Sequence, residues 1–435
     1  MILATALLAG CPASSEEVQP QRDQIDFPSG LALSPAQDLL FAVSANSNLR
    51  YSSGLVSVFD ADLIDSLIDG WLDSGDPGPC QPDGTSPAVL ACDESDAVLS
   101  DASVRIGNFA TAIAVQTLDS GDLRLFVPVR GDPSVTWIDV DPSSGELSCG
   151  GSGSLPECDE AHRLTDLRGD ASLGTVVDEP FGVFVDSQNH YALVSHLTRG
   201  AVSLIDTPGT GDPPVLTDAA GGLFASNGGS AGATGIAGRV PGSAADLIYV
   251  TSRSEARVQV LYVKRPDGGG LPFLVPADFF FLNMVQPSTD ARGIAFSSDG
   301  GRAFIVNRQP PMLHVVDTSA GPTGVPRNVL VGAIELCDQP SNIALADTGS
   351  GPVAYVACFD AGQVWAIDPG TRAVKALIAV GRGPHALAVS PDRNRLYVGN
   401  FLDSTISVVD ITPGAITENH VVLRLGRPVA GGKGE

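Results

Sequence analysis

Six cationic or basic side chains lie at equivalent points of a repeating pattern of short apolar segments and turns. Four are arginines and two are histidines: Arg130, His196, Arg253, Arg292, Arg308 and His385. Arginine presents a planar fork of N–H donors that matches a carboxylate or a phosphate group. If the repeat brings the six side chains together, they predict a binding site for a small anionic ligand or an acidic peptide segment.

An alternative interpretation is that the arginines are already neutralised. Carboxylates that could pair with them occur nearby in the pattern: Asp178, Glu179, Asp290 and Asp338. Such ion pairs would tie adjacent units together and leave no free positive charge for a ligand. Replacing Arg253 and Arg308 by alanine separates the two interpretations, because only a ligand site would lose anion binding in a variant that still folds.

The elements that must position these residues are short strands. From Gly383 to Ile411 the sequence GPHALAVSPDRNRLYVGNFLDSTISVVDI contains three alternating apolar segments separated by turn residues, which is typical of half-buried strands. The pattern recurs along the chain. Its first strands begin beside Gly30, Ala112, Gly182, Gly235, Gly293, Asn342 and Ala386. Six of the seven third strands end on aspartate, which can accept hydrogen bonds from the turn that follows.

Seven units of three strands, each with room for a fourth, predict an all-β fold, a seven-bladed β-propeller over residues 27–435. Val421–Leu425 would complete the last blade, and insertions are expected at about 61–100 and 141–178. Within the first insertion, apolar residues at helical spacing predict a short helix over 62–72 that packs on the blade rim.

In a propeller, two sets of turns meet at one mouth of the central channel. The residues expected just before the first strands are Ser29, Thr111, Phe181, Thr234, Arg292, Ser341 and His385. Those expected just after the second strands are Ala45, Arg130, His196, Arg253, Arg308, Phe359 and Phe401. The fold therefore predicts that the six candidate residues converge.

The segment LYVGNFLDSTISVVD resembles the YVTN-type repeat of bacterial seven-bladed propellers, and FIVNRQPPMLHVVD and AYVACFDAGQVWAID are weaker copies. Asn307-Arg308 also resembles a motif of related propeller lactonases, which hydrolyse a sugar lactone. That resemblance implies an alternative function as a lactonase-like hydrolase. Glu179 or Asp290 would be the base, His196 or His385 the proton carrier, and Arg253 or Arg308 the stabiliser of the oxyanion.

The N-terminus indicates export. Leu8-Ala9-Gly10-Cys11 follows an apolar run and resembles the bacterial lipobox, in which the cysteine is lipidated. We expect a signal peptide over 1–10, lipidation at Cys11, a polar tether over 11–26 and no membrane contact other than the lipid. This predicts a lipoprotein of the bacterial cell envelope, in the outer membrane and facing the periplasm or the cell surface. A plain secretory signal or an unprocessed N-terminus is the alternative.

The other six cysteines form an even set of near neighbours, which in an oxidising compartment predicts disulfides. The expected pairs are Cys80 with Cys92, Cys149 with Cys158, and Cys337 with Cys358. Free thiols are the alternative. The sequence contains no CxxC motif, which argues against zinc ribbons and c-type haem.

Composition narrows the possible partners. The chain carries 25 Lys and Arg against 50 Asp and Glu, a formal net charge of −25, so nucleic acid is not an expected partner. Acidic turns at 73–76 and 119–122 could hold calcium, but solvated turns are their usual meaning, and no cofactor or metal is expected. We therefore expect a binding or interaction module for an unknown protein or a small anionic ligand, rather than an enzyme.

Overall fold

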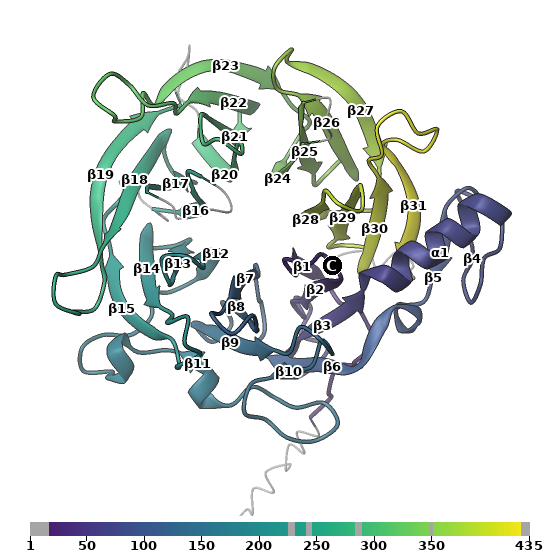
Figure 1. The fold of residues 1–435 in the computed structure, drawn as a ribbon, viewed down its shortest axis with the longest axis horizontal. Coiled ribbons are helices and arrows are strands. Elements are labelled where there is room, and N and C mark those ends of the chain that lie inside the picture. The colour runs from purple at the N-terminus through teal and green to yellow at the C-terminus, as the bar shows by residue number, and fades with distance from the viewer. Residues whose placement is uncertain (1–16, 225–230, 241–245, 283–288, 348–350, 428–435) are drawn as a thin grey trace, which may run out of the picture.

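The computed structural model describes residues 17–224, 231–240, 246–282, 289–347 and 351–427, and it is a seven-bladed β-propeller, as predicted (Figure 1). Each blade contains an antiparallel sheet of four strands, with the first strand nearest the central channel. Blade 1 comprises β1 (Pro28–Leu33), β2 (Leu39–Ser44), β3 (Gly54–Asp60) and β6 (Val98–Ile106). Blade 2 comprises β7 (Ala114–Thr117), β8 (Leu123–Val129), β9 (Ser134–Val140) and β10 (Leu147–Ser148), with β11 (Arg163–Leu164) beside β9.

The remaining blades follow in chain order. Blade 3 comprises β12 (Pro180–Asp186), β13 (Tyr191–His196), β14 (Ala201–Asp206) and β15 (Val215–Ala220). Blade 4 comprises β16 (Ala233–Gly238), β17 (Ile248–Ser252), β18 (Arg257–Lys264) and β19 (Phe273–Phe281). Blade 5 comprises β20 (Thr289–Phe296), β21 (Arg302–Gln309), β22 (Pro311–Asp317) and β23 (Val329–Glu335). Blade 6 comprises β24 (Pro340–Asp347), β25 (Pro352–Cys358), β26 (Gln363–Asp368) and β27 (Ala373–Ala379). Blade 7 comprises β28 (Pro384–Ser390), β29 (Arg395–Asn400), β30 (Thr405–Asp410) and β31 (His420–Leu425).

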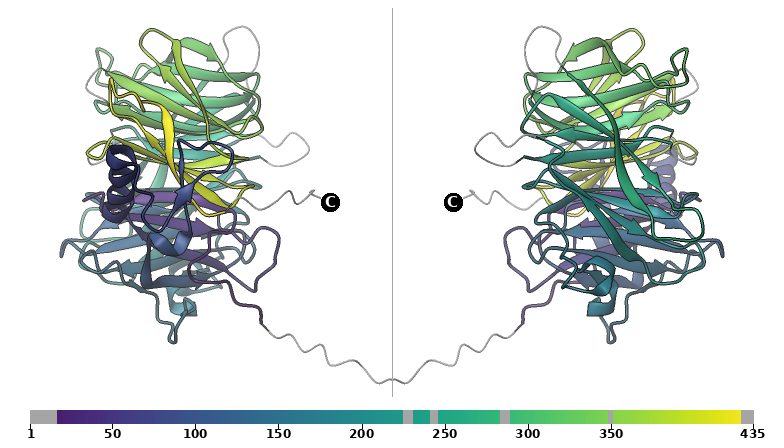
Figure 2. Two further views of the ribbon diagram at one scale, coloured as in Figure 1. Left: turned by 90° about the vertical axis from the view of Figure 1, so that its right-hand side faces the viewer. Right: turned by 90° about the vertical axis from the view of Figure 1, so that its left-hand side faces the viewer.

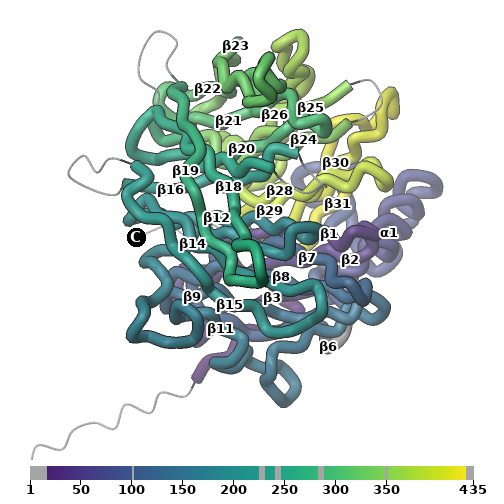
Figure 3. The backbone as a smooth tube through the Cα atoms, turned by 60° about the vertical axis from the view of Figure 1, so that its left-hand side comes forward, coloured from purple at the N-terminus to yellow at the C-terminus, as the bar shows by residue number. Residues whose placement is uncertain are grey.

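The core lies between the blades rather than at the centre of the ring. Along β2, Leu40 packs toward blade 7 and Phe41 packs toward blade 2, because successive side chains of a strand point to opposite faces. Both faces of the second strands are therefore buried, which explains their nearly continuous apolar sequences. The outer strands β15 and β19 lie next to each other along the rim (Figure 3).

Glycines let the innermost strands approach one another around the channel. A Cβ atom on Gly182 would lie 2.6 Å from the carbonyl oxygen of Thr234 in blade 4. One on Gly235 would lie 2.0 Å from the carbonyl oxygen of Arg292 in blade 5. Backbone of the next blade thus occupies the space that a larger side chain would need.

The insertion that follows β3 closes the ring. It forms α1 (Ala61–Ser74), β4 (Gln81–Pro82) and β5 (Leu90–Cys92), and β5 pairs in parallel with β31, the outer strand of blade 7. The helix covers the expected 62–72, and its buried Ile64 and Ile68 belong to the core between blades 1 and 7. Figure 2 shows α1 at one face of the disc. Blade 7 is completed by β31, as expected.

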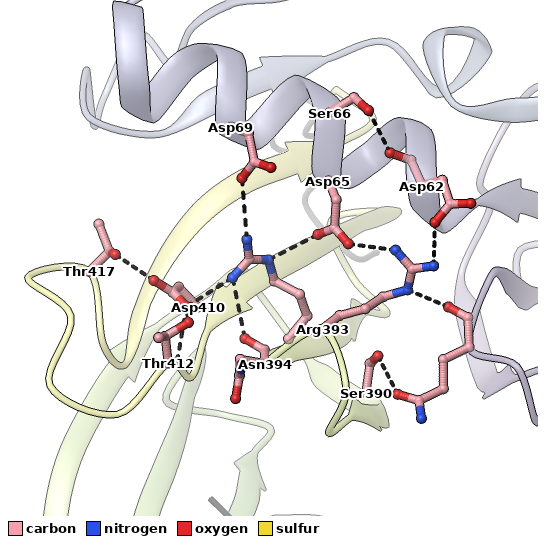
Figure 4. A network of polar contacts seen from close by, with 12 residues as sticks. Asp62, Asp65, Ser66, Asp69, Ser390, Arg393, Asn394, Asp410, Thr412 and Thr417 are labelled. Atoms are coloured by element: carbon pink, nitrogen blue, oxygen red, sulfur yellow. Dashed lines mark hydrogen bonds and ion pairs between the residues drawn. The ribbon is translucent and has the colours of Figure 1, made fainter.

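Ion pairs fix α1 to blade 7 (Figure 4). Asp65 lies between Arg393 in the β28–β29 turn and Arg395 at the start of β29, 2.6 Å from Nη1 of Arg393 and 3.2 Å from Nε of Arg395. Arg393 also pairs with Asp62, and Arg395 pairs with Asp410 at 2.9 Å. The N-terminal insertion and the C-terminal blade are therefore joined by both strand pairing and charge.

All three predicted disulfides are present, and they reinforce the insertions and blade 6. They join Cys80 to Cys92, Cys149 to Cys158, and Cys337 to Cys358. The disulfide between Cys80 and Cys92 joins the last residue of β5 to the residue that precedes β4. The insertion at 141–178 also carries two short turns of helix, at Glu160–His162 and Leu167–Gly169, and the earlier insertion carries one, at Glu94–Asp96.

Candidate functional site

Each blade has a residue in the left-handed backbone conformation, in the turn before its first strand or, in blade 5, at the second residue of that strand. The seven residues, called here the entry residues, are Phe27, Phe109, Glu179, Gly232, Asp290, Gln339 and Gly383, with φ between 50° and 66°. Only glycine adopts this conformation without a steric penalty. Five blades nevertheless use a larger side chain there, and such strain is concentrated at functional sites in many proteins.

A shared backbone hydrogen bond brings a second set of residues beside the entry residues. The first residue after the second strand donates its N–H to the entry carbonyl in six blades, at 2.8–3.2 Å. The donors are Ala45, Arg130, Leu197, Arg253, Phe359 and Phe401. In blade 5 the pairing of Ala291 with Asn307 places Arg308 at the same position. Both sets lie on one face of the ring, which we call the mouth.

The structure places His196 away from the mouth. It is the last residue of β13, pairs with Pro180, and is followed by Leu197, which holds the position expected for the histidine. A shift of one residue turns a side chain to the opposite face of the strand. The ring of His196 is accordingly buried, with Nε2 2.8 Å from the hydroxyl of Ser203, and burial lowers its pKa to about 4.

Two neighbouring cavities, which share several lining residues, lie at the mouth. The outer one, of about 380 Å³, is lined by four phenylalanines and by Arg130, Arg308, Asp360 and His385. The phenylalanines are Phe109, Phe181, Phe359 and Phe401. The inner cavity, of about 240 Å³, lies among the first strands, and its lining includes Arg292, Ser341 and Asn342. Arg308 and His385 line both cavities, so they mark the boundary between them.

Two of the four predicted arginines are neutralised by entry residues. Arg130 pairs with Glu179, and Nε of Arg292 lies 2.6 Å from Oδ1 of Asp290. Burial disfavours the charged form of Glu179, but hydrogen bonds from Thr198 and Arg130 outweigh it and lower the pKa of this carboxyl. The structure thus agrees with the ion-pair alternative for Arg130, whose partner precedes the next blade, whereas the pair of Arg292 with Asp290 neutralises the charge within β20 and joins no blades.

Arg308 differs from these two. Within the described ranges, no carboxylate lies within 4.0 Å of its guanidinium, and its Nε donates to the carbonyl of Pro340 at 2.9 Å. Burial, together with the neighbouring charge of Arg292, lowers the pKa of Arg308 to about 10, so it remains protonated at neutral pH. A positive charge with no directly contacting carboxylate among the described residues therefore lies where the two cavities meet, and Asp290 and Asp360 act on it only from farther away.

Arg253 differs from Arg308 in that it lies outside both cavities. It occupies the same position in blade 4, is solvent-exposed, and has no ion pair to any part of the chain that the structure describes. The fold therefore brings Arg130, Arg292, Arg308 and His385 together at the channel, while Arg253 faces solvent.

Neutral hydrogen-bonding groups surround Arg308. Burial, and then the charges of Arg308 and Arg292, lower the pKa of His385 to about 4, so its imidazole is neutral at pH 7 and has one N–H to donate. Ser29 lines both cavities, and its buried hydroxyl has no hydrogen-bond partner as far as the described residues extend. A buried hydroxyl without a partner is costly unless a ligand or water satisfies it.

Among the entry residues, the sequence predicts Glu179 and Asp290 as partners of the arginines, but it misses the other entry residues and Asp360. Phe109 and Gln339 line the outer cavity, and Phe27 packs against Phe401 with ring centroids 5.1 Å apart. A signal for the entry residues was present, because each lies two residues before the position predicted to precede a first strand. Only the left-handed conformation shows that these side chains turn toward the mouth.

No family model matches the chain. "Antigen Lp49" of Leptospira interrogans is 27% identical over 213 residues, and the match covers 38% of this chain and 45% of that protein. The chain thus spans under half the length of this curated relative.

Solved propellers are similar in fold alone. Hydrazine synthase of Kuenenia stuttgartiensis has a TM-score of 0.56 at 14% identity, covering 93% of this chain and 99% of that chain. The periplasmic gluconolactonase PpgL of Pseudomonas aeruginosa has a TM-score of 0.51 at 17% identity, covering 82% and 86%. A putative 6-phosphogluconolactonase of Bacteroides fragilis has a TM-score of 0.51 at 15% identity, with the same coverage. These unrelated activities on one fold mean that function must be argued from the site.

Proposed function

We propose that the protein is a binding module of the bacterial cell envelope that holds a small anionic ligand at the mouth of its channel. The observation that carries this proposal is the unpaired guanidinium of Arg308 at the boundary of two cavities. A partly buried cation without a counter-charge is costly, and an anionic ligand would supply the missing charge. Cavities of this size accommodate one small molecule rather than a folded partner.

The envelope location has separate support. Three disulfides are typical of proteins that fold in an oxidising compartment. The partial similarity to a Leptospira antigen is compatible with export. In the described portion of the chain, no helix has the length and apolarity needed to cross a bilayer. Anchoring by lipid at Cys11, which lies outside the described residues, remains part of the proposal, and mass spectrometry of the mature N-terminus tests it.

The ligand site is tested with two arginine variants, one at a residue that lines the cavities and one at a residue that does not. Arg308→Gln removes the charge at the cavity boundary, whereas Arg253→Gln removes an exposed charge at the same position of another blade. We expect small carboxylates to raise the thermal midpoint of the wild type and of Arg253→Gln, but not of Arg308→Gln. Equal midpoint shifts in all three proteins would contradict a site at Arg308.

A lactonase-like hydrolase is the second candidate, because Asp360, His385 and Arg308 line one cavity. The low pKa of His385 makes its imidazole a weak base at neutral pH, and Asp360 is exposed, so the geometry favours binding. Hydrolysis of sugar lactones by the wild type, and its loss in Asp360→Asn, would reverse that preference.

A further inference from the structure

We infer that the ligand is a planar cyclic monocarboxylate, bound with its carboxylate on Arg308 and its ring directed outward among the phenylalanines of the mouth. This inference rests on the proposed function and deepens it by naming the ligand class. It is carried by the order of the surfaces along the channel, which are apolar and aromatic outside and polar and cationic inside.

The outer cavity suits a flat apolar body. Phe109, Phe181, Phe359 and Phe401 come from blades 2, 3, 6 and 7, so rings approach the opening from several sides. All four are only partly buried, and the centroids of Phe359 and Phe401 are 6.4 Å apart. Half-exposed aromatic rings that surround an opening bind another ring by stacking and edge contacts.

The inner boundary suits a carboxylate. Arg308 offers N–H donors beyond the Nε that is bonded to Pro340, neutral His385 offers one donor, and Ser29 offers an unpartnered hydroxyl. A carboxylate has two acceptor oxygens and about four lone-pair directions, so it can accept from all three groups. A neutral amide would leave the guanidinium without a counter-charge.

The charge balance around the cavities favours a single negative charge. Glu179 neutralises Arg130, and Asp290 neutralises Arg292. His385 is neutral at pH 7, and Asp360 adds a negative charge to the outer lining. Asp360 is exposed and, among the described residues, makes no ion pair with Arg308, so solvent screens its charge, and a single negative charge on the ligand is the most that Arg308 can balance. A phosphate dianion would bring a second charge with no cation left to pair with it.

The inference is tested by ligand-observed NMR titration of the purified chain with five probes. These are benzoate, acetate, hexanoate, benzamide and phenyl phosphate. We expect benzoate to bind about tenfold or more tightly than acetate because its ring is buried among phenylalanines. We expect hexanoate and phenyl phosphate to bind more weakly than benzoate, and benzamide not to bind detectably.

Variants separate the ring contacts from the charge. Phe359→Leu and Phe401→Leu should each weaken benzoate several-fold and leave acetate unchanged, while Phe279→Leu on the outer strand β19 should change neither. Arg308→Gln should abolish binding of both acids. Thermal midpoints and circular dichroism, with Arg253→Gln as the matched control, show whether each variant is folded.

The outcomes for the inference and for the proposed function are distinct. If benzoate and acetate bind equally and both depend on Arg308, the aromatic class is wrong and the anion site stands. Tighter binding of hexanoate or phenyl phosphate than of benzoate also overturns the class. If no anion binds, or if Arg308→Gln binds as the wild type does, both the class and the proposed function are wrong.

Discussion

At the scale of single residues, most of the entry residues combine a strained left-handed backbone with a side chain at the mouth. Two blades place glycine there and five do not. The larger side chains supply a ring at Phe109 and counter-charges at Glu179 and Asp290. Each of these five residues therefore costs some backbone stability and places a side chain near the channel, as expected of a functional surface.

At Gln339 the stability cost of the left-handed conformation can be measured. This residue is exposed, has φ of 51°, and makes no ion pair among the described residues. We expect Gln339→Gly to stabilise the fold by about 1 kcal/mol, because glycine relieves the left-handed strain at little cost in packing. Asp338→Gly, at the exposed neighbour, which is not left-handed, should be neutral or destabilising. Thermal unfolding of the two variants is the measurement, and equal effects would contradict the argument.

The residue scale also shows where prediction from sequence stops. Repeat alignment located Arg130, Arg292, Arg308 and His385 at the channel, but it placed His196 at the mouth when the equivalent residue is Leu197. An apolar segment such as Tyr191–His196 is buried on both faces, so its sequence does not mark which residue ends the strand. Whether an arginine is paired also depends on residues in other turns, as Arg130 depends on Glu179, and the local sequence around the arginine does not specify that pairing.

At the scale of elements, α1 and β5 act as the closure of the ring. The helix itself was predictable from its apolar spacing. The position of the insertion in the fold was not predictable, because β5 pairs with β31, more than 300 residues later, and the local sequence does not specify that partner. The ion pairs that α1 makes with Arg393 and Arg395 are equally long-range.

Asp65 is the centre of this closure, and a matched aspartate lies one turn along the helix. The side chain of Asp65 is 20% exposed and contacts both Arg393 and Arg395, whereas Asp69 is 68% exposed and lies 3.9 Å from Arg395. We expect Asp65→Ala to destabilise the fold by about 2–3 kcal/mol, because it leaves two largely buried guanidiniums short of a partner. Asp69→Ala should change stability by less than about 0.5 kcal/mol.

Denaturant unfolding of the two variants checks this prediction. Limited proteolysis adds a local readout, since loss of the α1 contacts should expose cleavage sites in the insertion before the blades unfold. If Asp65→Ala and Asp69→Ala have the same midpoint, charge is not what fixes α1 to blade 7. Burial of Ile64 and Ile68 would then account for its docking.

At the scale of the whole molecule, the ring encloses histidines of three separate blades, two of them fully buried and His385 partly buried. His196 lies in blade 3, His314 in blade 5 and His385 in blade 7, and the pKa of each is lowered to about 4, chiefly by burial. A histidine whose folded pKa is depressed binds its proton more readily when unfolded. Stability is then fully present above the unfolded pKa, near 6.5, and declines as the pH falls toward 4.

His314 gives the sharpest test of this pH dependence. His314 lies on β22 and is 1% exposed. Neither nitrogen of its ring has a hydrogen-bond partner within the described structure. Lowering the pH from 7 to 5 should cost about 2 kcal/mol through this residue alone. We expect His314→Leu to remove that part of the pH dependence and to be no less stable at pH 7, because the apolar side chain leaves no unsatisfied nitrogen. His420→Gln, at an exposed position of β31, serves as the control and should retain the wild-type profile. Thermal midpoints measured from pH 7 to pH 5 decide the matter: parallel profiles for the wild type and His314→Leu would show that acid sensitivity resides elsewhere in the ring.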